Sequence, residues 1–445
     1  MKNYYPLCLI IFFFSLPTNA QDVDFSKIKP GGVKLYLTED SSSYFRLFSF
    51  THIWLRYTDF NPGTVDAAGI PKQHDFDVGI RRNRSGFYLH LFERLITFTQ
   101  FGISAQTYVS DTRPQLFFLD LTTEYEFIKE KLSLGYGLHS WQGVARQGNI
   151  GAPHFLYIDN PGFSYPLVGT FDQSGRQLGL YARGLVGDFQ YRVSLSKPFS
   201  YNALANNDTL FNVAYEYPNT TWSYKGYFNW QFLENEPDEF AWKRMNYLGE
   251  KKIFNIGAGF HYHPATMQTF TESGAGLLKE DMLLTGIDAF LDYPLANKSS
   301  FTGYLVWFNY DFGSNYLRRG GLMNTGFGGE INGRPLLQGG GNSEWAFGTG
   351  NIIHAEAGYL LPDLKILNGK RLQFFGGYTF KDLEGLGTNL HQFDAGVNYL
   401  FYGHHVKCGL QISSRPIYDG TIGENAQGGI EMHKATLIFN TQVDF

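Results

Sequence analysis

Arginines are the residues of this sequence whose spacing points to chemistry. Four of them stand in stretches of alternating residues, each on the face opposite the apolar side chains: Arg82, Arg84, Arg183 and Arg192. Successive side chains of a strand point to opposite faces. An arginine at the midplane of a lipid-facing surface costs roughly 2–4 kcal/mol. If these stretches cross a bilayer, the four guanidiniums must face a water-filled lumen, where they would favour anions.

The same guanidiniums have a second interpretation, in which carboxylates in the lumen neutralise them. Candidate partners on neighbouring predicted strands and turns are Glu124, Glu126 and Asp188. Ion pairs of this kind would stiffen the structure and leave a neutral lining. The sequence leaves both alternatives open.

Other residue types give weaker signals. The chain has 12 histidines, and the close pairs are His261 with His263 and His404 with His405. No cysteine or carboxylate is predictably near either pair, so a structural role is expected rather than a metal site. No local pattern aligns a serine with a histidine, so we expect neither an enzyme nor a cofactor.

The elements that would position the arginines are clearest at the C-terminus. Residues 433–445 alternate strictly, with apolar side chains on one face and mostly polar ones on the other, and end at Phe445. This length matches a tilted transmembrane strand of roughly 9–11 residues. A terminal aromatic resembles the signal that the barrel-insertion machinery reads on the closing strand of an outer-membrane barrel. The alternative for this stretch alone is the last strand of a soluble β-sandwich.

The rest of the chain favours the barrel. Alternating stretches recur along it, and their connections alternate between tight turns and long loops. Aromatic residues gather near strand ends, including Tyr57, Tyr108, Trp141, Trp230, Tyr310 and Tyr402. Bacterial outer-membrane barrels combine short periplasmic turns, long outer loops and aromatic girdles. The prediction is an all-β chain that forms one transmembrane antiparallel β-barrel.

The number of strands follows from parity, because bacterial barrels have an even number. If residues 211–217 form a strand, another is needed before residues 253–262. The candidate is 238–248, although its alternation is poor. This count gives 18 strands, and discarding weak segments gives 16, so the expectation is 16–18.

The N-terminus predicts export. Residues 1–20 combine Lys2, a short apolar run and small residues at Thr18, Asn19 and Ala20, as in a signal peptide. Residues 21–44 would be a periplasmic lead-in and residues 45–445 the barrel. Beyond the predicted signal peptide only Cys408 remains, so no internal disulfide can form. A net charge of −5 argues against a nucleic-acid partner.

Several strand motifs resemble the phosphate-selective porins O and P, with the Bacteroidetes branch nearest. They are IRRNRSGF at residues 80–87, DQSGRQLG at 172–179, YLGEKKIFNIGAGF at 247–260, GTGN at 348–351 and EAGYLL at 356–361. The resemblance covers most of residues 45–445 and implies a barrel of 16 strands, often trimeric, that passes small hydrophilic solutes. Asn83 and the net acidic charge depart from the family pattern, so phosphate selectivity does not carry over.

Residues 142–175 form a long connection without a strand pattern, and in the strand count they are the third outer loop. In general porins this loop folds inward and narrows the pore. We expect it to bring Arg146, and Arg176 just after it, to the arginines of the strands. The alternative is an ordinary surface loop.

The predicted function is passive diffusion of small hydrophilic solutes, with anions as candidates, through a porin in the outer membrane. Its partners would be outer-membrane lipid and, during biogenesis, the barrel-assembly machinery, with a homotrimer as the assembly that the resemblance implies. The alternative is a plugged barrel that acts as a scaffold or receptor, with residues 311–350 binding a partner. Conductance across a planar bilayer discriminates the two.

Overall fold

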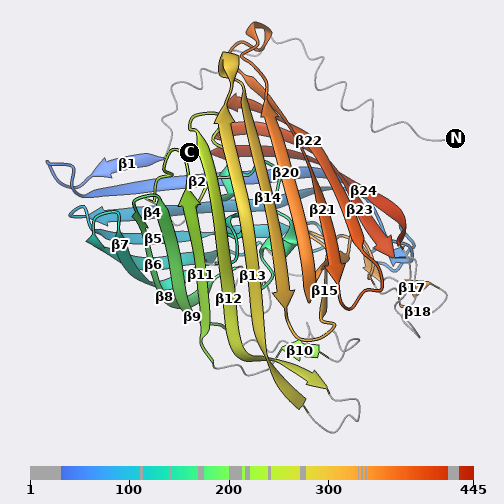
Figure 1. Cartoon of the computed structure of the whole chain (residues 1–445). Helices are drawn as coiled ribbons and strands as arrows, with labels where there is room; N and C mark the ends of the chain where they lie inside the picture. Colours follow the sequence, from blue (N-terminus) through green and yellow to red (C-terminus); the bar gives the residue numbers. More distant parts are fainter. Residues whose placement is uncertain are drawn as a thin grey trace.

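The computed structural model describes residues 32–110, 114–140, 143–168, 175–199, 213–215, 221–238, 242–270, 277–328, 330–331, 334–335, 338–418 and 430–445. It is one barrel of long, tilted strands (Figure 1). The predicted signal peptide lies outside the described residues, as do residues 21–31 of the predicted lead-in.

Sixteen of the described strands form the closed wall, each antiparallel to both neighbours. They are β2 (Tyr44–Asp59), β4 (His74–Leu91), β5 (Leu95–Gln106), β6 (Phe117–Ile128), β7 (Leu132–His139), β8 (Gln177–Val186), β9 (Phe189–Lys197), β11 (Ser223–Gln231), β12 (Ile253–Phe270), β13 (Leu277–Pro294), β14 (Ser300–Asp311), β20 (Gly350–Leu360), β21 (Arg371–Leu383), β22 (Leu390–Tyr402), β23 (Val406–Tyr418) and β24 (Ile430–Asp444).

The barrel closes where β24 pairs with β2, for example Leu55 with Phe439. The last residue completes this seam, because Phe445 and Ser49 exchange two backbone hydrogen bonds of 3.0 Å each. Closure leaves no strand edge unpaired, as a lipid environment requires. The predicted transmembrane antiparallel barrel and its closing strand are therefore confirmed.

Shorter strands and 3₁₀ turns accompany the sixteen strands of the wall. β1 (Val33–Tyr36) pairs with β2, and β10 (Val213–Tyr215) pairs with β12. The others are β3 (Thr64–Val65), β15 (Leu317–Gly320), β16 (Phe327–Gly328), β17 (Glu330–Ile331), β18 (Arg334–Pro335), β19 (Glu344–Gly348), and the 3₁₀ turns η2 (Arg146–Asn149), η3 (Ala152–His154), η4 (Gly162–Ser164), η7 (Ala296–Lys298) and η8 (Lys365–Leu367). Within the described residues, no helix has the length and apolar character needed to span a membrane.

Strand alternation separates an apolar outer surface from the barrel interior. On β14, Phe301, Leu305 and Trp307 are exposed on the outside, whereas Thr302 and Tyr304 are buried inside. The same division recurs around the wall and gives a broad apolar outer belt. Such a belt suits the acyl chains of a bilayer.

The two ends of the barrel differ. One end, here called the turn end, carries the tight turns at residues 92–94, 187–188 and 403–405 and the C-terminus. The opposite loop end carries the long connections, including residues 311–350. Residues 232–252 are the exception, because they join β11 to β12 at the turn end and are much longer than its other turns.

The observed wall of 16 strands lies within the predicted range of 16–18, and this exception explains why the count of 18 does not hold. The described part of the expected strand at 238–248 adds no strand to the wall and runs inside the barrel instead. Lys243 makes a single parallel bridge there with Ile150. Residues 213–215 of the expected strand at 211–217 pair only with the overhanging end of β12. Losing both segments leaves an even number of 16.

Candidate functional site

Two chain segments enter the barrel from opposite ends. The first, called the outer insert, is residues 143–168 of the predicted third outer loop. The second, called the inner insert, comprises residues 232–238 and 242–252 at the turn end. Leu156 and Met245 are fully buried inside the barrel. The described part of the third loop therefore folds inward, as the sequence predicted.

Hydrogen bonds from strand side chains fix the outer insert to the wall. Asn398 Nδ2 donates to the Leu156 carbonyl at 2.8 Å, and Lys407 Nζ donates to the Phe155 carbonyl at 3.2 Å. On its other side, the insert packs with Tyr304 and other apolar residues of β14 in one hydrophobic cluster. The main apolar core of this protein thus lies within its barrel.

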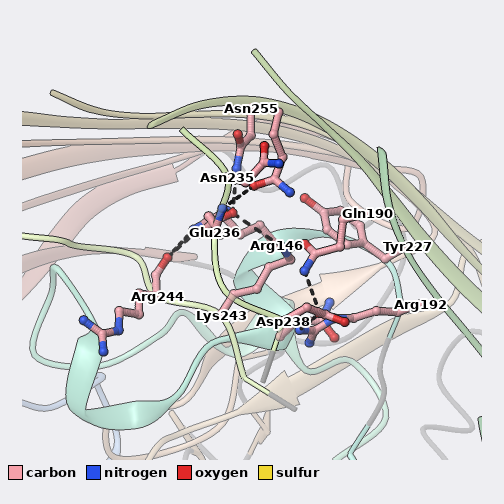
Figure 2. A network of polar contacts seen from close by, with 12 residues as sticks. Arg146, Gln190, Arg192, Tyr227, Asn235, Glu236, Asp238, Lys243, Arg244 and Asn255 are labelled. Atoms are coloured by element: carbon pink, nitrogen blue, oxygen red, sulfur yellow. Dashed lines mark hydrogen bonds and ion pairs between the residues drawn. The ribbon is translucent and has the colours of Figure 1, made fainter. Parts of the chain in front are cut away.

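A buried polar network joins the two inserts (Figure 2). Arg146 of the outer insert donates from Nη1 to Oε2 of Glu236 in the inner insert at 2.8 Å. Tyr247 Oη and Asn255 Nδ2 each donate to the same carboxylate at 2.6 Å. Burial opposes ionisation of Glu236, but Arg146 and Lys243 outweigh it and hold its pKa well below the usual value. The inserts are therefore held together by a fully desolvated ion pair.

Asp238 of the inner insert binds two of the predicted pore arginines. Its Oδ2 accepts from Arg183 at 2.9 Å, and its Oδ1 accepts from Arg192 at 3.2 Å. Arg183 also donates to Glu124 on β6, with 2.6 Å between Nη2 and Oε1. These guanidiniums face the interior, but ion pairs hold them there, as the second interpretation of the sequence described.

Beside the inserts runs a cavity of about 970 Å³. Its lining includes Phe445 and His405 at the turn end and Leu322 at the loop end, so it extends along the height of the barrel. Phe48 and Phe98 place β2 and β5 in its wall. Its basic lining residues are Arg46, Arg81, Arg82, Arg84, Arg176, Lys243 and Arg244.

The six arginines predicted to line a pore thus fall into two groups. Arg82, Arg84 and Arg176 are in the cavity lining. Three lie outside that lining, in the buried ion pairs of the inserts: Arg146, Arg183 and Arg192.

A β-bulge brings a further arginine to the cavity. His52 on β2 pairs with Arg82 and Ile53 pairs with Ile80, so Arg81 is the extra residue on β4. Such a residue breaks the alternation of faces. Arg81 and Arg82 consequently both reach Asp159 of the outer insert, the second at 2.6 Å.

Asp159 faces two cations but carries one negative charge. Burial favours its neutral form, yet Arg81 and Arg82 outweigh this effect and hold its pKa below the usual value. A single carboxylate cannot neutralise both guanidiniums, so this cluster keeps a net positive charge beside the cavity.

The remaining predicted cavity arginines differ in their partners. Arg176 donates from Nη2 to Asp120 Oδ2 at 2.9 Å. Arg84 makes a long contact of 3.4 Å to Ser104 Oγ, and among the described residues no carboxylate lies within ion-pair distance of it. Arg84 therefore presents the least neutralised guanidinium of the predicted set.

Sequence reasoning missed four basic residues of the lining. Arg46 could have been found, because it alternates with the outward-facing Phe45 and Leu47 of β2. The bulge hides Arg81, since strict alternation places it outside. Lys243 and Arg244 lie on the inner insert, which has no strand periodicity to show where its side chains point.

No protein-family model matches this sequence, and no curated protein matches it. Solved structures with a similar fold include Salmonella typhi OmpF in complex with daunomycin, at 10% sequence identity and a TM-score of 0.51, covering 93% of this chain and 100% of that chain. Pseudomonas putida OprB at high pH is similar at 8% identity and a TM-score of 0.54, covering 90% of this chain and 94% of that chain. The fold is therefore that of the outer-membrane porins.

Proposed function

We propose that this protein is an outer-membrane porin through which small hydrophilic solutes diffuse passively, with a preference for anions. The observation that carries the proposal is the cavity, which extends along the barrel and is lined by seven basic and two acidic residues. A narrow channel with a low-dielectric wall concentrates ions of opposite charge. The basic lining would therefore raise the local concentration of anions.

The charge balance supports this preference even after the ion pairs are counted. Arg81 and Arg82 share one carboxylate, and Arg84 has none within ion-pair distance among the described residues. The acidic lining residues are Glu250, which lies 3.7 Å from Arg244, and Asp444. The positive charges therefore exceed the negative ones along this wall.

The apolar outer belt and the porin fold support a place in the outer membrane. The likeness of the strand motifs to phosphate-selective porins O and P belongs to the same proposal, as do the signal peptide at residues 1–20 and assembly into a homotrimer. Phosphate itself is not favoured over other anions by any feature of the lining.

A second candidate is a plugged barrel that acts as a scaffold or receptor. Its support is the packing of the inserts, which fill part of the interior with apolar side chains such as Leu156 and Met245. At the loop end, the described part of residues 311–350 adds to this filling, because Arg56 donates to the carbonyls of Leu322 and Met323. A plugged barrel would not conduct.

Planar-bilayer recording of the full-length protein tests both candidates. A porin gives stepwise conductance, and under a salt gradient its reversal potential indicates anion preference. Replacing Arg82, Arg84 and Arg176 together by Gln should shift that potential toward cations, while Arg94→Gln at an exposed turn should leave it unchanged. Absence of conductance in a folded barrel would refute the porin and favour the scaffold.

A further inference from the structure

An aromatic cluster occupies the lumen side of the wall, where porins usually present polar residues. It consists of Phe48 on β2, Tyr88 on β4 and Phe98 on β5. The Tyr88 and Phe98 rings are stacked at 4.5 Å between centroids, and Phe48 lies 5.6 Å from Tyr88 and 6.0 Å from Phe98. All three line the cavity. Phe48 and Tyr88 are partly exposed and can contact a solute, whereas Phe98 is buried and supports the Tyr88 ring from behind.

The space for this cluster is built into β4. Gly86 lies between Phe48 and Gln100 in the strand register. A Cβ at Gly86 would come within 2.6 Å of the Phe48 ring. The missing side chain leaves room for the Phe48 ring over Gly86, beside Tyr88.

Guanidiniums flank the cluster along the barrel axis. Arg46 pairs with Tyr88 in the register, and Arg84 pairs with Phe50. These two pairs are four positions apart on β2, which corresponds to about 13 Å. A solute that rests on the rings thus has a cation within reach toward either end of the channel.

The outer insert adds a further apolar surface to the cavity, near Arg82, which lies beyond Arg84 from the cluster on β4. Phe155 of this insert lines the cavity, and the Arg82 guanidinium lies 5.4 Å from the centre of that ring. The wall and the insert together give two apolar faces with cations at their edges. Inorganic anions gain nothing from such apolar surfaces, whereas an anion with an apolar body can contact them.

We propose that the channel favours organic anions whose carboxylate is attached to an aromatic or similarly flat apolar body. This inference rests on the proposed anion-preferring porin and names its solute class. The carboxylate would bind Arg84 by charge-assisted hydrogen bonds, and the ring would pack on the Tyr88 ring that Phe98 supports. Acetate can use only the first contact, and phosphate gains nothing from the rings.

The experiment measures block of chloride current through the full-length protein in planar bilayers, with benzoate, acetate and phosphate as probes. An aromatic contact is worth up to about a tenfold change in affinity, equivalent to about 1.4 kcal/mol. We expect half-block by benzoate at a concentration about tenfold lower than by acetate or phosphate. Equal half-block by benzoate and acetate in an anion-selective channel would overturn the inference and leave the proposed function intact.

Variants assign the effect to the cluster. Tyr88→Leu with Phe98→Leu keeps an apolar wall but removes the stacking faces, so the preference for benzoate over acetate should fall severalfold. The matched control is Phe87→Leu, which lies on the outer face of the same strand and should leave the preference unchanged. Retained preference in the double variant would overturn the role of this cluster. A channel that does not conduct, or prefers cations, would overturn the proposed function itself and with it this inference.

Discussion

The ion pair between the inserts gives the sharpest test of how the barrel interior is built. Arg146 and Glu236 expose 0% and 2% of their side chains. In Glu236→Gln, Arg146 and Lys243 lose their shared carboxylate while the shape of the site is kept. Removing one partner of a buried pair costs about 3–5 kcal/mol, because the other charge stays desolvated and uncompensated.

This cost falls on the inserts rather than on the barrel wall. The wall is held by the closed ladder of backbone hydrogen bonds, and the outer insert keeps its bond from the Arg146 amide to Asp288 at 2.6 Å. A loss of about 3–5 kcal/mol raises local opening by a factor of roughly 100 to several thousand. We therefore expect Glu236→Gln to loosen the inner insert in an intact barrel.

Two measurements check this expectation. Hydrogen exchange should accelerate in residues 242–252 and 143–168, and single-channel current should become larger and noisier as the inserts leave the lumen. Glu250→Gln is the matched control on the same insert: its pair with Arg244 is exposed, so the change should cost under about 1 kcal/mol. Unchanged exchange and current in Glu236→Gln would show that the ion pair does not hold the inserts.

Three further predictions concern charge and closure. Burial lowers the pKa of Lys243 to about 8, although Glu236 opposes this shift. Because Lys243 then loses its positive charge as pH rises from about 7 to about 9, the anion preference of the channel should fall over this range. Lys243→Gln should flatten this dependence of anion preference on pH. Hydrogen bonding to Asp444 raises the pKa of His405, although burial opposes it. The stability that the His405–Asp444 pair contributes is present below the ordinary histidine pKa and is lost as pH rises through the raised pKa. Thermal unfolding should therefore occur at a lower temperature near pH 9 than near pH 6. His405→Gln should remove this difference in unfolding temperature. Deleting Phe445 removes its backbone pair with Ser49 and should lower the yield of heat-modifiable barrel without changing selectivity; wild-type yield would contradict this prediction.

The wall of the barrel was predictable because successive side chains of a strand point to opposite faces, which gives the sequence a period of two. Thirteen residues at the C-terminus sufficed to identify the closing strand, since one face is mainly apolar. The same reasoning predicted that Arg82 and Arg183 point to the interior, where the structure places them. It could not decide whether they are paired, because the carboxylates come from other segments: Glu124 from β6, but Asp159 from the outer insert.

The inner insert was the main failure of the sequence reasoning. A connection of 21 residues between β11 and β12 is too long for the short periplasmic turns expected of a barrel. The requirement for an even number of strands therefore led to the assignment of residues 238–248 as a wall strand. The composition of the inner insert explains its position inside the barrel. Glu236, Asp238 and Lys243 can lie at membrane depth only where they form ion pairs with residues of opposite charge. Arg146, Arg183 and Arg192 provide those charges inside the barrel.

The distribution of charge partners explains how an acidic chain can contain a basic channel. Two carboxylates of the inner insert, Glu236 and Asp238, neutralise Arg146 of the outer insert and the arginines of β8 and β9. Space remains along β2, β4 and β5, where Arg84 has no ion-pair partner among the described residues and Arg81 and Arg82 share one. An ion in transit responds to this wall and not to the net charge, because interactions with distant exposed charges are screened within about 10 Å. The proposed anion preference therefore depends on the arginines along this wall that the carboxylates of the inserts leave incompletely neutralised.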